Sequence, residues 1–387
     1  MIYDAIVIGL GGMGSAALFH LARRGARVLG LEQFGIAHDR GSSHGQSRII
    51  RLAYAEHPDY VPLLRRAYAL WRDLEAIAHE NLLIVTGGID AGTPDSVIVE
   101  GSLASCAIHG IPHELLHADA LNRRFPGYRL PRDMVGVYQG DAGFLVPEAC
   151  IAAHVSAARA LDAEVHTGEK VMSWHAQDDE VLVIGERARY RGRRLIVSAG
   201  PWARALVPVL ERLAVPQRQV MLWTQPLVPE LFEVSRFPVF NMEAHEGRFY
   251  GFPSHAAGGF KIGKYNHRRE EVADPDEMDR ECHPADEAVL REGVSRYFPD
   301  ANGPTLAMKT CLFTNSPDEH FIIDRLPEAE HVAIAAGFSG HGFKFCSVVG
   351  EILADLALDG ATPHGIDLFR LDRPALRGSS ESFDARS

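Results

Sequence analysis

The chain is expected to fold as a mixed α/β protein with two domains that alternate along the sequence, and three observations predict this. Apolar, β-branched runs that lead through glycine-rich turns into helices occur near both ends of the chain and once in the middle. Proline-containing segments with short alternating runs lie between them. A length of 387 residues with 46% hydrophobic composition is sufficient for two hydrophobic cores.

The beginning of the chain contains a strand, a glycine-rich turn, a helix and a second strand. The apolar run 5–8 predicts the first buried strand. The glycines that follow match the GxGxxG pattern, which gives a tight turn, close approach of a pyrophosphate and close packing of helix on strand: Gly9, Gly11 and Gly14. Glu32 ends the second strand, where a carboxylate can accept hydrogen bonds from a ribose. The segment therefore predicts a dinucleotide site and does not distinguish NAD from FAD.

Two further segments repeat this order of elements. A buried strand at 195–198 leads through the turn at Gly200 into a helix, and segment 331–358 reads as strand, glycine-rich turn and amphipathic helix. The stretch 33–60 is rich in Gly, Ser, His and Arg, and long loops of this kind often carry functional residues. Apolar residues at helical spacing predict a helix that begins at Tyr60.

The segments between these units differ in residue pattern, with prolines and short alternating runs of apolar and polar residues. Short alternating runs such as "RFYGFPSH" and "GGFKIGKY" favour strands of a separate sheet. We assign residues 80–145 and 211–310 to a substrate domain, and residues 1–79, 146–210 and 311–387 to the nucleotide-binding domain.

Composition argues against several classes of protein. The formal net charge is -12 and the basic runs are short, which makes nucleic acid an unlikely partner. The five cysteines lack regular spacing and no HExxH or CxxC motif occurs, so neither a disulfide framework nor a metal site is expected. No apolar run of 18 residues and no basic region before the first apolar run are present. We expect no membrane association and a cytoplasmic location.

Several separated motifs resemble those of the monomeric sarcosine oxidase and N-methyltryptophan oxidase family. They are the initial GxGxxG, "HGQSRIIRLAY" at 44–54, "YGFPS" followed by Lys261, "KTCLFT" with "DEHFIID", and "GFSGHGFKF" at 337–345. The resemblance covers essentially the whole chain. It implies a Rossmann-type FAD-binding domain interleaved with a substrate domain built on a mixed β-sheet. It also implies oxidation of a secondary amino acid by FAD and oxygen, which yields hydrogen peroxide and, from an N-methyl substrate, formaldehyde.

The resemblance implies that the flavin is attached covalently through the sulfur of Cys311. Residue type alone would favour a small buried hydrophobe at this position. Arg48 and His44 match residues near the flavin ring, and the turn with Gly342 and Lys344 opens a helix whose N-terminus can stabilise negative charge on the reduced flavin. The residues expected to contact FAD are Gly9, Gly11, Gly14, Glu32, Ser42, Arg48, Val171, Gly200, Cys311, Gly340, Gly342, Phe343 and Lys344.

The remaining site residues are also implied by the resemblance. Arg51 and Lys344 match the clamp for the substrate carboxylate, an anion that the forked guanidinium binds well. Lys261 matches the lysine that activates oxygen. Arg48 and Arg51 are three residues apart and are expected on one face of a helix. The predicted catalytic residues are Lys261, Arg48, His44 and Tyr250, and the predicted substrate-binding residues are Arg51, Lys344, Tyr250, Phe313 and Asn241.

Three positions depart from the sarcosine oxidase pattern around the substrate. Phe313 stands in place of a tyrosine, Asn241 in place of a methionine and Tyr265 in place of a histidine. The substrate is therefore open between an N-methyl amino acid and a bulkier or cyclic secondary amino acid, such as pipecolate or a glycated amino acid.

Two other functions are compatible with parts of the sequence. The beginning of the chain alone would support an NAD-dependent dehydrogenase, and a non-catalytic flavin subunit is opposed by the joint presence of Lys261, Arg51 and Lys344. A monomer whose partners are a small amino acid and O2 is expected.

Overall fold

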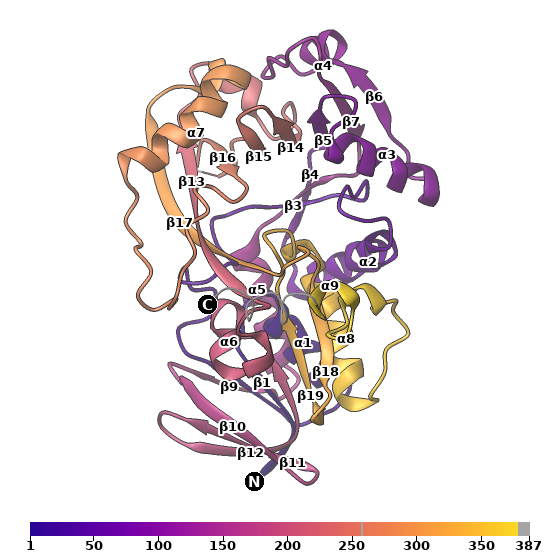
Figure 1. The fold of residues 1–387 in the computed structure, drawn as a ribbon, viewed down its shortest axis with the longest axis vertical. Coiled ribbons are helices and arrows are strands. Elements are labelled where there is room, and N and C mark those ends of the chain that lie inside the picture. The colour runs from indigo at the N-terminus through magenta and orange to yellow at the C-terminus, as the bar shows by residue number, and fades with distance from the viewer. Residues whose placement is uncertain (257, 378–387) are drawn as a thin grey trace, which may run out of the picture.

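The computed structural model of the protein describes residues 1–256 and 258–377. Figure 1 shows two lobes stacked along the long axis of the molecule, with the N-terminus at the tip of the lower lobe. Each lobe contains one eight-stranded sheet, and helices pack on both. The predicted mixed α/β class is confirmed.

The sheet of the lower lobe is built around β1. Its order is β10-β11-β12-β1-β2-β9, and β19 also pairs with β12 and β18 with β19. Its strands are β1 (Ile2–Ile8), β2 (Val28–Glu32), β9 (Glu164–Thr167), β10 (Val171–Gln177), β11 (Glu180–Gly185), β12 (Arg189–Val197), β18 (Ile322–Leu326) and β19 (Ala329–Ala336). Because β2, β1, β12 and β19 run parallel, their carboxyl ends meet at one edge. The three strand-turn-helix segments predicted from the sequence all contribute to this edge.

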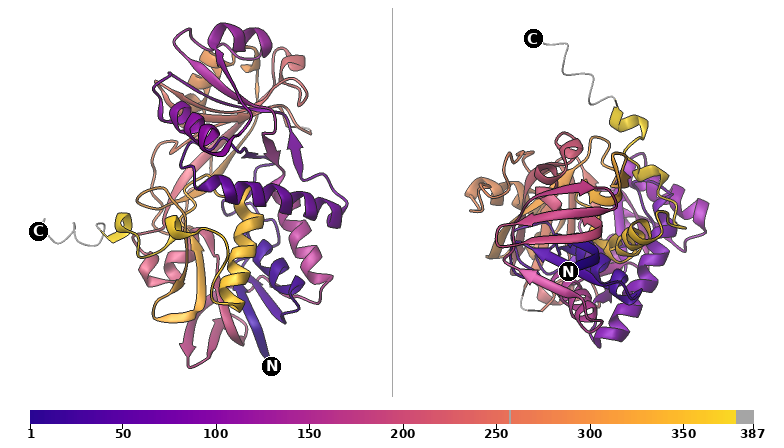
Figure 2. Two further views of the ribbon diagram at one scale, coloured as in Figure 1. Left: turned by 90° about the vertical axis from the view of Figure 1, so that its right-hand side faces the viewer. Right: turned by 90° about the horizontal axis from the view of Figure 1, so that it is seen from below.

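Helices cover this sheet. They are α1 (Gly12–Arg23), α2 (Tyr60–Ala78), α5 (Pro147–Arg159), α6 (Ala203–Leu206) and α8 (Cys346–Leu358), with short 3-10 turns η1 (Gly200–Trp202), η2 (Pro208–Leu210), η5 (Phe343–Phe345) and η6 (Asp367–Phe369) and the terminal α9 (Pro374–Arg377). A Cβ added at Gly350 of α8 would lie 2.5 Å from Ala16 of α1, so these two helices pack backbone to backbone. The left view of Figure 2 shows α2 lying across the top of this layer, below the upper lobe.

The upper lobe contains a mixed sheet of order β17-β13-β16-β15-β14-β5-β7-β6. Its strands are β5 (Gly88–Gly92), β6 (Glu114–His117), β7 (Val135–Gln139), β13 (Val215–Thr224), β14 (Val239–Ala244), β15 (Gly247–Phe252), β16 (Phe260–Lys264) and β17 (Thr305–Asn315). The helices are α3 (Val97–His109), α4 (Ala118–Arg124) and α7 (Pro284–Tyr297), with η3 (Pro229–Phe232) and η4 (Pro299–Ala301). Phe240 and Phe249 face an aromatic core on one side of the sheet, so Asn241 and Tyr250, their neighbours in sequence, face the opposite side.

A small sheet joins the two lobes and corrects one prediction. It consists of β3 (Arg48–Ile50), β8 (Gly143–Leu145) and β4 (Leu83–Val85). The prediction that Arg48 and Arg51 lie on one face of a helix is wrong. Arg48 lies on β3 opposite Leu145, and Arg51 follows the strand. The β-branched pair Ile49-Ile50 suits a strand, and its pairing partner lies almost a hundred residues away.

The position of β17 in the upper sheet affects one of the predicted domain boundaries. The proposed boundary between residues 310 and 311 falls inside β17, which pairs with β13 along its length. Cys311 thus lies on the upper sheet, and we propose that the substrate domain extends to Asn315.

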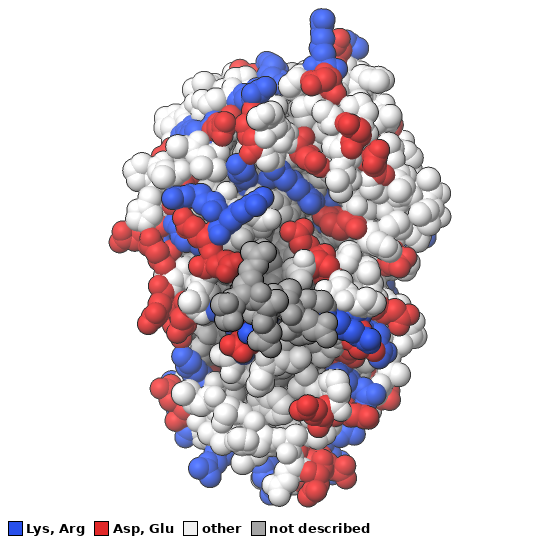
Figure 3. Space-filling model, in the orientation of Figure 1, with Lys and Arg blue, Asp and Glu red and all other residues white. Residues whose placement is uncertain are grey.

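The surface shown in Figure 3 carries acidic and basic side chains interspersed over both lobes. Among the described residues, no helix is sufficiently long and apolar to cross a bilayer. Within the same residues, no group of three or more His, Cys, Asp or Glu side chains is placed to hold a metal ion.

Candidate active site

A cavity of about 510 Å³ lies where the carboxyl edge of the lower sheet meets the free face of the upper sheet. Most of the predicted site residues line it: Gly9, Gly11, Glu32, Ser42, Arg48, Arg51, Val171, Gly200, Asn241, Tyr250, Phe313, Gly340, Gly342, Phe343 and Lys344. Tyr265, a position that departs from the sarcosine oxidase pattern, lines it as well. The other four predicted residues, Gly14, His44, Lys261 and Cys311, are buried close to this wall.

The first glycine-rich turn has the shape that a dinucleotide requires. A Cβ on Gly14 would lie 1.8 Å from the carbonyl oxygen of Gly9, so only glycine lets α1 start this close to β1. A Cβ on Gly11 would meet no heavy atom within 4 Å, since that position opens into the cavity. The N-terminus of α1 therefore faces open volume over bare backbone, where a pyrophosphate is stabilised by the helix N–H groups.

Glu32 is fixed at the end of β2. Its carboxylate accepts hydrogen bonds from the backbone N–H of Leu10 at 2.8 Å and of Phe34 at 2.9 Å. Each oxygen retains a further lone pair for a ribose hydroxyl. This arrangement fits the adenosine half of FAD.

The second glycine-rich turn forms the opposite wall of the cavity. Gly340 has a positive φ of 77°, and a Cβ there would lie 2.3 Å from the ring of Phe313. Glycine at this position thus allows the ring of Phe313 to pack closely against the turn. The turn continues through η5 into α8, so the start of a long helix adjoins the cavity as predicted.

Arg48 connects the buried residues that the resemblance placed near the flavin ring. Its Nη2 donates to the carbonyl of Ser42 at 2.8 Å and lies 3.8 Å from the Sγ of Cys311. Burial raises the pKa of the Cys311 thiol, and the charge of Arg48 partly opposes this. His44 is buried with no hydrogen-bond partner for either ring nitrogen among the described residues. Burial, aided by Arg48, lowers the pKa of His44 to about 3, so this imidazole is neutral and has free polar atoms beside the cavity.

Lys261 is held as a buried amine on β16. Its Nζ donates to the carbonyls of Gly45 at 2.7 Å and Ser47 at 2.9 Å, and lies 4.5 Å from the ring centroid of Phe252. Burial, followed by the charge of Arg48, lowers its pKa well below 10.5. The carbonyls and the ring face are the groups that stabilise its charged form.

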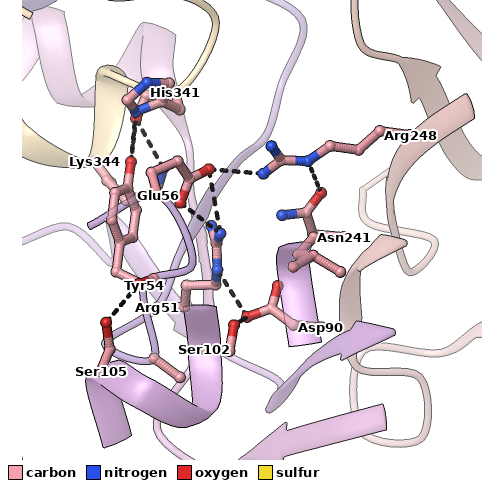
Figure 4. Close-up of polar contacts among 12 residues, drawn as sticks. Arg51, Tyr54, Glu56, Asp90, Ser102, Ser105, Asn241, Arg248, His341 and Lys344 are labelled. Carbon is pink, nitrogen blue, oxygen red and sulfur yellow. Dashed lines mark hydrogen bonds and ion pairs between the residues drawn. The ribbon is translucent and has the colours of Figure 1, made fainter. Parts of the chain in front are cut away.

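A cluster of charged side chains borders the cavity, which two of its members, Arg51 and Lys344, line (Figure 4). Arg51 donates from Nε to Asp90 at 3.0 Å and from Nη2 to Glu56 at 3.1 Å. Glu56 also accepts from Nη2 of Arg248 at 2.6 Å. Lys344 enters the cluster from the second turn, and its Nζ donates to the carbonyl of His341 at 2.8 Å.

The cluster has more cations than anions. Burial alone would raise the pKa of Glu56, but Arg51 and Arg248 hold it well below 4.5. Burial, followed by the charge of Arg51, lowers the pKa of Lys344 to about 7. With Lys344 protonated, three cations face two carboxylates, Glu56 and Asp90. The site therefore suits one additional anion.

Sequence reasoning did not find Glu56, Asp90 and Arg248. Asp90 lies beside Asn241 on the neighbouring strand, so its location depends on the register of β5 and β14. The sequence does contain a pattern that places Arg248 near the site. Arg248 precedes Tyr250 by two residues in an alternating run, so both side chains lie on one face of the strand.

The three departures from the sarcosine oxidase pattern lie together. The ring of Tyr265 is 5.5 Å from that of Tyr250 and 5.6 Å from that of Phe313, and Asn241 pairs with Tyr250 across β14 and β15. Gly263, opposite Tyr250, leaves room for that ring, because a Cβ there would approach it to 2.3 Å.

Comparisons with known proteins identify the family of the chain. The model of the FAD-dependent oxidoreductase family matches residues 4–356. Monomeric sarcosine oxidase from Streptomyces avermitilis is 45% identical over 377 residues, which is 95% of this chain and 96% of that protein. N-methyl-L-tryptophan oxidase from Salmonella arizonae is 36% identical over 96% of this chain and 99% of that protein.

A solved structure also matches. NikD, described as an unusual amino acid oxidase essential for nikkomycin biosynthesis, superimposes with a TM-score of 0.84 at 26% identity and covers 95% of this chain and 97% of its own. The predicted resemblance is confirmed: the chain belongs to the FAD-dependent oxidoreductase family that includes monomeric sarcosine oxidase and N-methyl-L-tryptophan oxidase.

Proposed function

We propose that this FAD-dependent oxidoreductase oxidises the C–N bond of a secondary amino acid, with an N-methyl amino acid such as sarcosine or N-methyltryptophan as the substrate class. Oxygen and water are the co-substrates. The products are the demethylated amino acid, formaldehyde and hydrogen peroxide. The names of the relatives support the reaction class. The observation that carries the proposal is the cation-rich cluster beside the cavity, because it suits the carboxylate of an amino acid.

Arg51 and Lys344 provide the anchor for the substrate carboxylate. The ion pairs of Arg51 engage Nε and Nη2, which leaves Nη1 for a carboxylate oxygen. Lys344 lies across the cluster and adds a second cation, which a bound anion stabilises in its charged form. The carboxylate is then held by two groups from different elements, which orients the rest of the amino acid.

The residues present fit FAD. Gly9, Gly11 and Glu32 would hold its pyrophosphate and ribose, and Ser42, Val171 and Gly200 line the same part of the cavity. Arg48 and His44, with the second turn, would surround its ring. When bound, FAD supplies the two-electron acceptor that oxidises the substrate and is reoxidised by oxygen.

Cys311 is the proposed point of covalent attachment. Its thiol is buried, so it is inert to solvent reagents, yet Arg48 and Lys261 both favour the thiolate form. We propose a thioether between its Sγ and the 8-methyl carbon of the flavin; its formation would break the S–H bond and one methyl C–H bond, and the two electrons and two protons would end on O2 as hydrogen peroxide.

Lys261 is the proposed site of oxygen activation. A buried cation lowers the barrier to forming an anion from oxygen in a site shielded from water. Its carbonyl partners and the Phe252 ring offset part of the cost of burying the charge.

We also propose a cytoplasmic monomer. The names of the sarcosine oxidase relatives support the monomer. The described cysteines are all free, which fits a reducing compartment.

Oxygen consumption and formaldehyde release test the proposal. Sarcosine, N-methyl-L-tryptophan and pipecolate are compared at equal concentration with the purified yellow enzyme. Oxygen uptake with stoichiometric formaldehyde from the N-methyl substrates supports it. Oxygen uptake with pipecolate alone would move the function to cyclic amino acids, and NAD reduction without oxygen uptake would refute an oxidase.

A further inference from the structure

Asn241 places a buried hydrogen-bond donor at the wall of the cavity. The residue lies on β14, is 2% exposed and lines the cavity. Its Oδ1 accepts a hydrogen bond from Nε of Arg248 at 2.9 Å. Its Nδ2 has no hydrogen-bond partner among the described residues. Figure 4 shows this nitrogen on the side of Asn241 that faces Arg51.

Arg248 fixes the orientation of this amide. A guanidinium donates hydrogen bonds and accepts none, so the amide oxygen must face Arg248 and the NH2 group must face away from it. Arg248 is itself held by Glu56 at 2.6 Å and by the ring of Tyr265, whose centroid lies 4.3 Å from its Cζ. The donor is therefore preset before any ligand enters.

A buried donor without an acceptor is costly, and such a group in a cavity indicates a ligand with a matching acceptor. On this basis we infer that Asn241 and Arg248 form a specificity subsite for secondary amino acids whose side chain ends in a neutral hydrogen-bond acceptor, such as an amide or ketone carbonyl. This inference rests on the proposed function, because it places the substrate carboxylate on Arg51 and Lys344.

Charge decides between a neutral acceptor and a second carboxylate. Arg51, Arg248 and Lys344 face Glu56 and Asp90, so one substrate carboxylate already balances the cluster. A second carboxylate would bring an uncompensated negative charge into a buried site. Arg248 does not supply that compensation, because it is paired with Glu56.

The surroundings of Asn241 fit a substrate with a side chain. Tyr265 and Phe313 form an aromatic wall beside it, 5.6 Å apart between ring centroids. Asn241, Tyr265 and Phe313 are the three positions that depart from the sarcosine oxidase pattern, and all three line the cavity. They change the wall that a side chain on the substrate α-carbon would contact.

Three substrates of nearly equal shape test the inference: Nα-methyl-L-asparagine, Nα-methyl-L-leucine and Nα-methyl-L-aspartate. We expect kcat/KM for the asparagine compound to exceed that for the leucine compound by about tenfold or more, since one hydrogen bond to a preset donor distinguishes them. The aspartate compound should be the poorest of the three. Equal kcat/KM for the asparagine and leucine compounds, or preference for aspartate, would overturn the inference.

The variant Asn241→Leu keeps a branched side chain of similar size and removes the donor. Its asparagine-to-leucine ratio should fall to about one, with the leucine compound as the internal reference for any general loss of activity. Met242→Leu is the matched control, because its side chain packs in the core on the opposite face of β14, and this variant should keep the ratio. An unchanged ratio in Asn241→Leu would refute the role of the donor.

Two outcomes distinguish a failure of the Asn241 subsite from a failure of the proposed function. If sarcosine and the leucine compound are oxidised and the asparagine compound has no advantage, the subsite is refuted and the proposed function stands. If no N-methyl amino acid reduces the flavin, both are refuted. A change in the flavin spectrum of substrate-free Asn241→Leu that is absent in Met242→Leu would assign the donor to the cofactor and overturn the subsite.

Discussion

The proposed role of Lys344 in holding the substrate carboxylate predicts that binding of a carboxylate depends on pH, which can be measured directly. Its pKa is lowered to about 7 by burial and by the charge of Arg51. An anion bound beside it favours the charged form and raises that pKa. Above pH 7 the free enzyme must therefore take up a proton to bind the anion tightly, and affinity falls tenfold for each pH unit.

The size of the effect follows from that pKa. Between about pH 6 and about pH 9, the dissociation constant should rise by about a hundredfold, because pH 9 is two units above the pKa of Lys344. Glu56, His341 and Tyr54 keep their charge over this range, while burial raises the pKa of Asp90 and the charge of Arg51 opposes that rise. The pKa of Glu56 is held well below 4.5 by Arg51 and Arg248, burial lowers the pKa of His341 to about 3, and burial raises that of Tyr54 well above 10.

Methoxyacetate is a suitable probe, because it has the shape of sarcosine with an ether oxygen that cannot be protonated in place of the amine. Its affinity is measured through the perturbation of the flavin spectrum at each pH. Lys344→Met should bind the probe weakly at pH 6 and lose most of the pH dependence. A flat profile in the wild-type enzyme, or an equally steep one in Lys344→Met, would refute the assignment of Lys344 to the carboxylate.

Substitutions at Cys311, Lys261 and Gly14 test the proposed attachment, oxygen activation and nucleotide turn. Cys311→Ser should release flavin on acid precipitation while the wild type retains it; flavin that stays attached in the variant would assign another residue. Lys261→Met should slow reoxidation by oxygen by about a hundredfold or more and reduction by substrate far less; stopped-flow measurement of both half-reactions checks this, and equal losses would move Lys261 to positioning. Gly14→Ala should weaken FAD retention and cost about 1 to 3 kcal/mol of stability, because its Cβ would meet the Gly9 carbonyl at 1.8 Å; a variant with wild-type melting temperature and flavin content would contradict the packing argument.

The nucleotide half of the site was predictable from local sequence. Gly9, Gly11, Gly14 and Glu32 belong to one strand-turn-helix-strand unit, so their spacing along the chain determines their positions in space. The turn at Gly340 was predictable for the same reason. These elements form mainly through neighbours in sequence.

The substrate half depends on contacts that no local pattern contains. Asp90, Asn241 and Tyr250 form a row across three strands, and their alignment requires the register of the whole sheet. The expected helix at Arg48 failed for this reason, since the strand forms on a partner at Leu145. The resemblance to a family supplied Asn241 and Tyr250 where periodicity did not, but it supplied neither Asp90 nor Arg248.

An anaerobic titration shows whether the enzyme oxidises an amino acid that is held by its carboxylate. The holoenzyme is mixed without oxygen with N-methyl-L-tryptophan or sarcosine, and in parallel with N-methyltryptamine or dimethylamine, which lack only the carboxylate. We expect that the amino acids abolish the absorbance of the oxidised flavin and that the amines leave it unchanged at the same concentration. Reduction by the amines at rates equal to those of the amino acids, or no reduction by either amino acid, would contradict this expectation.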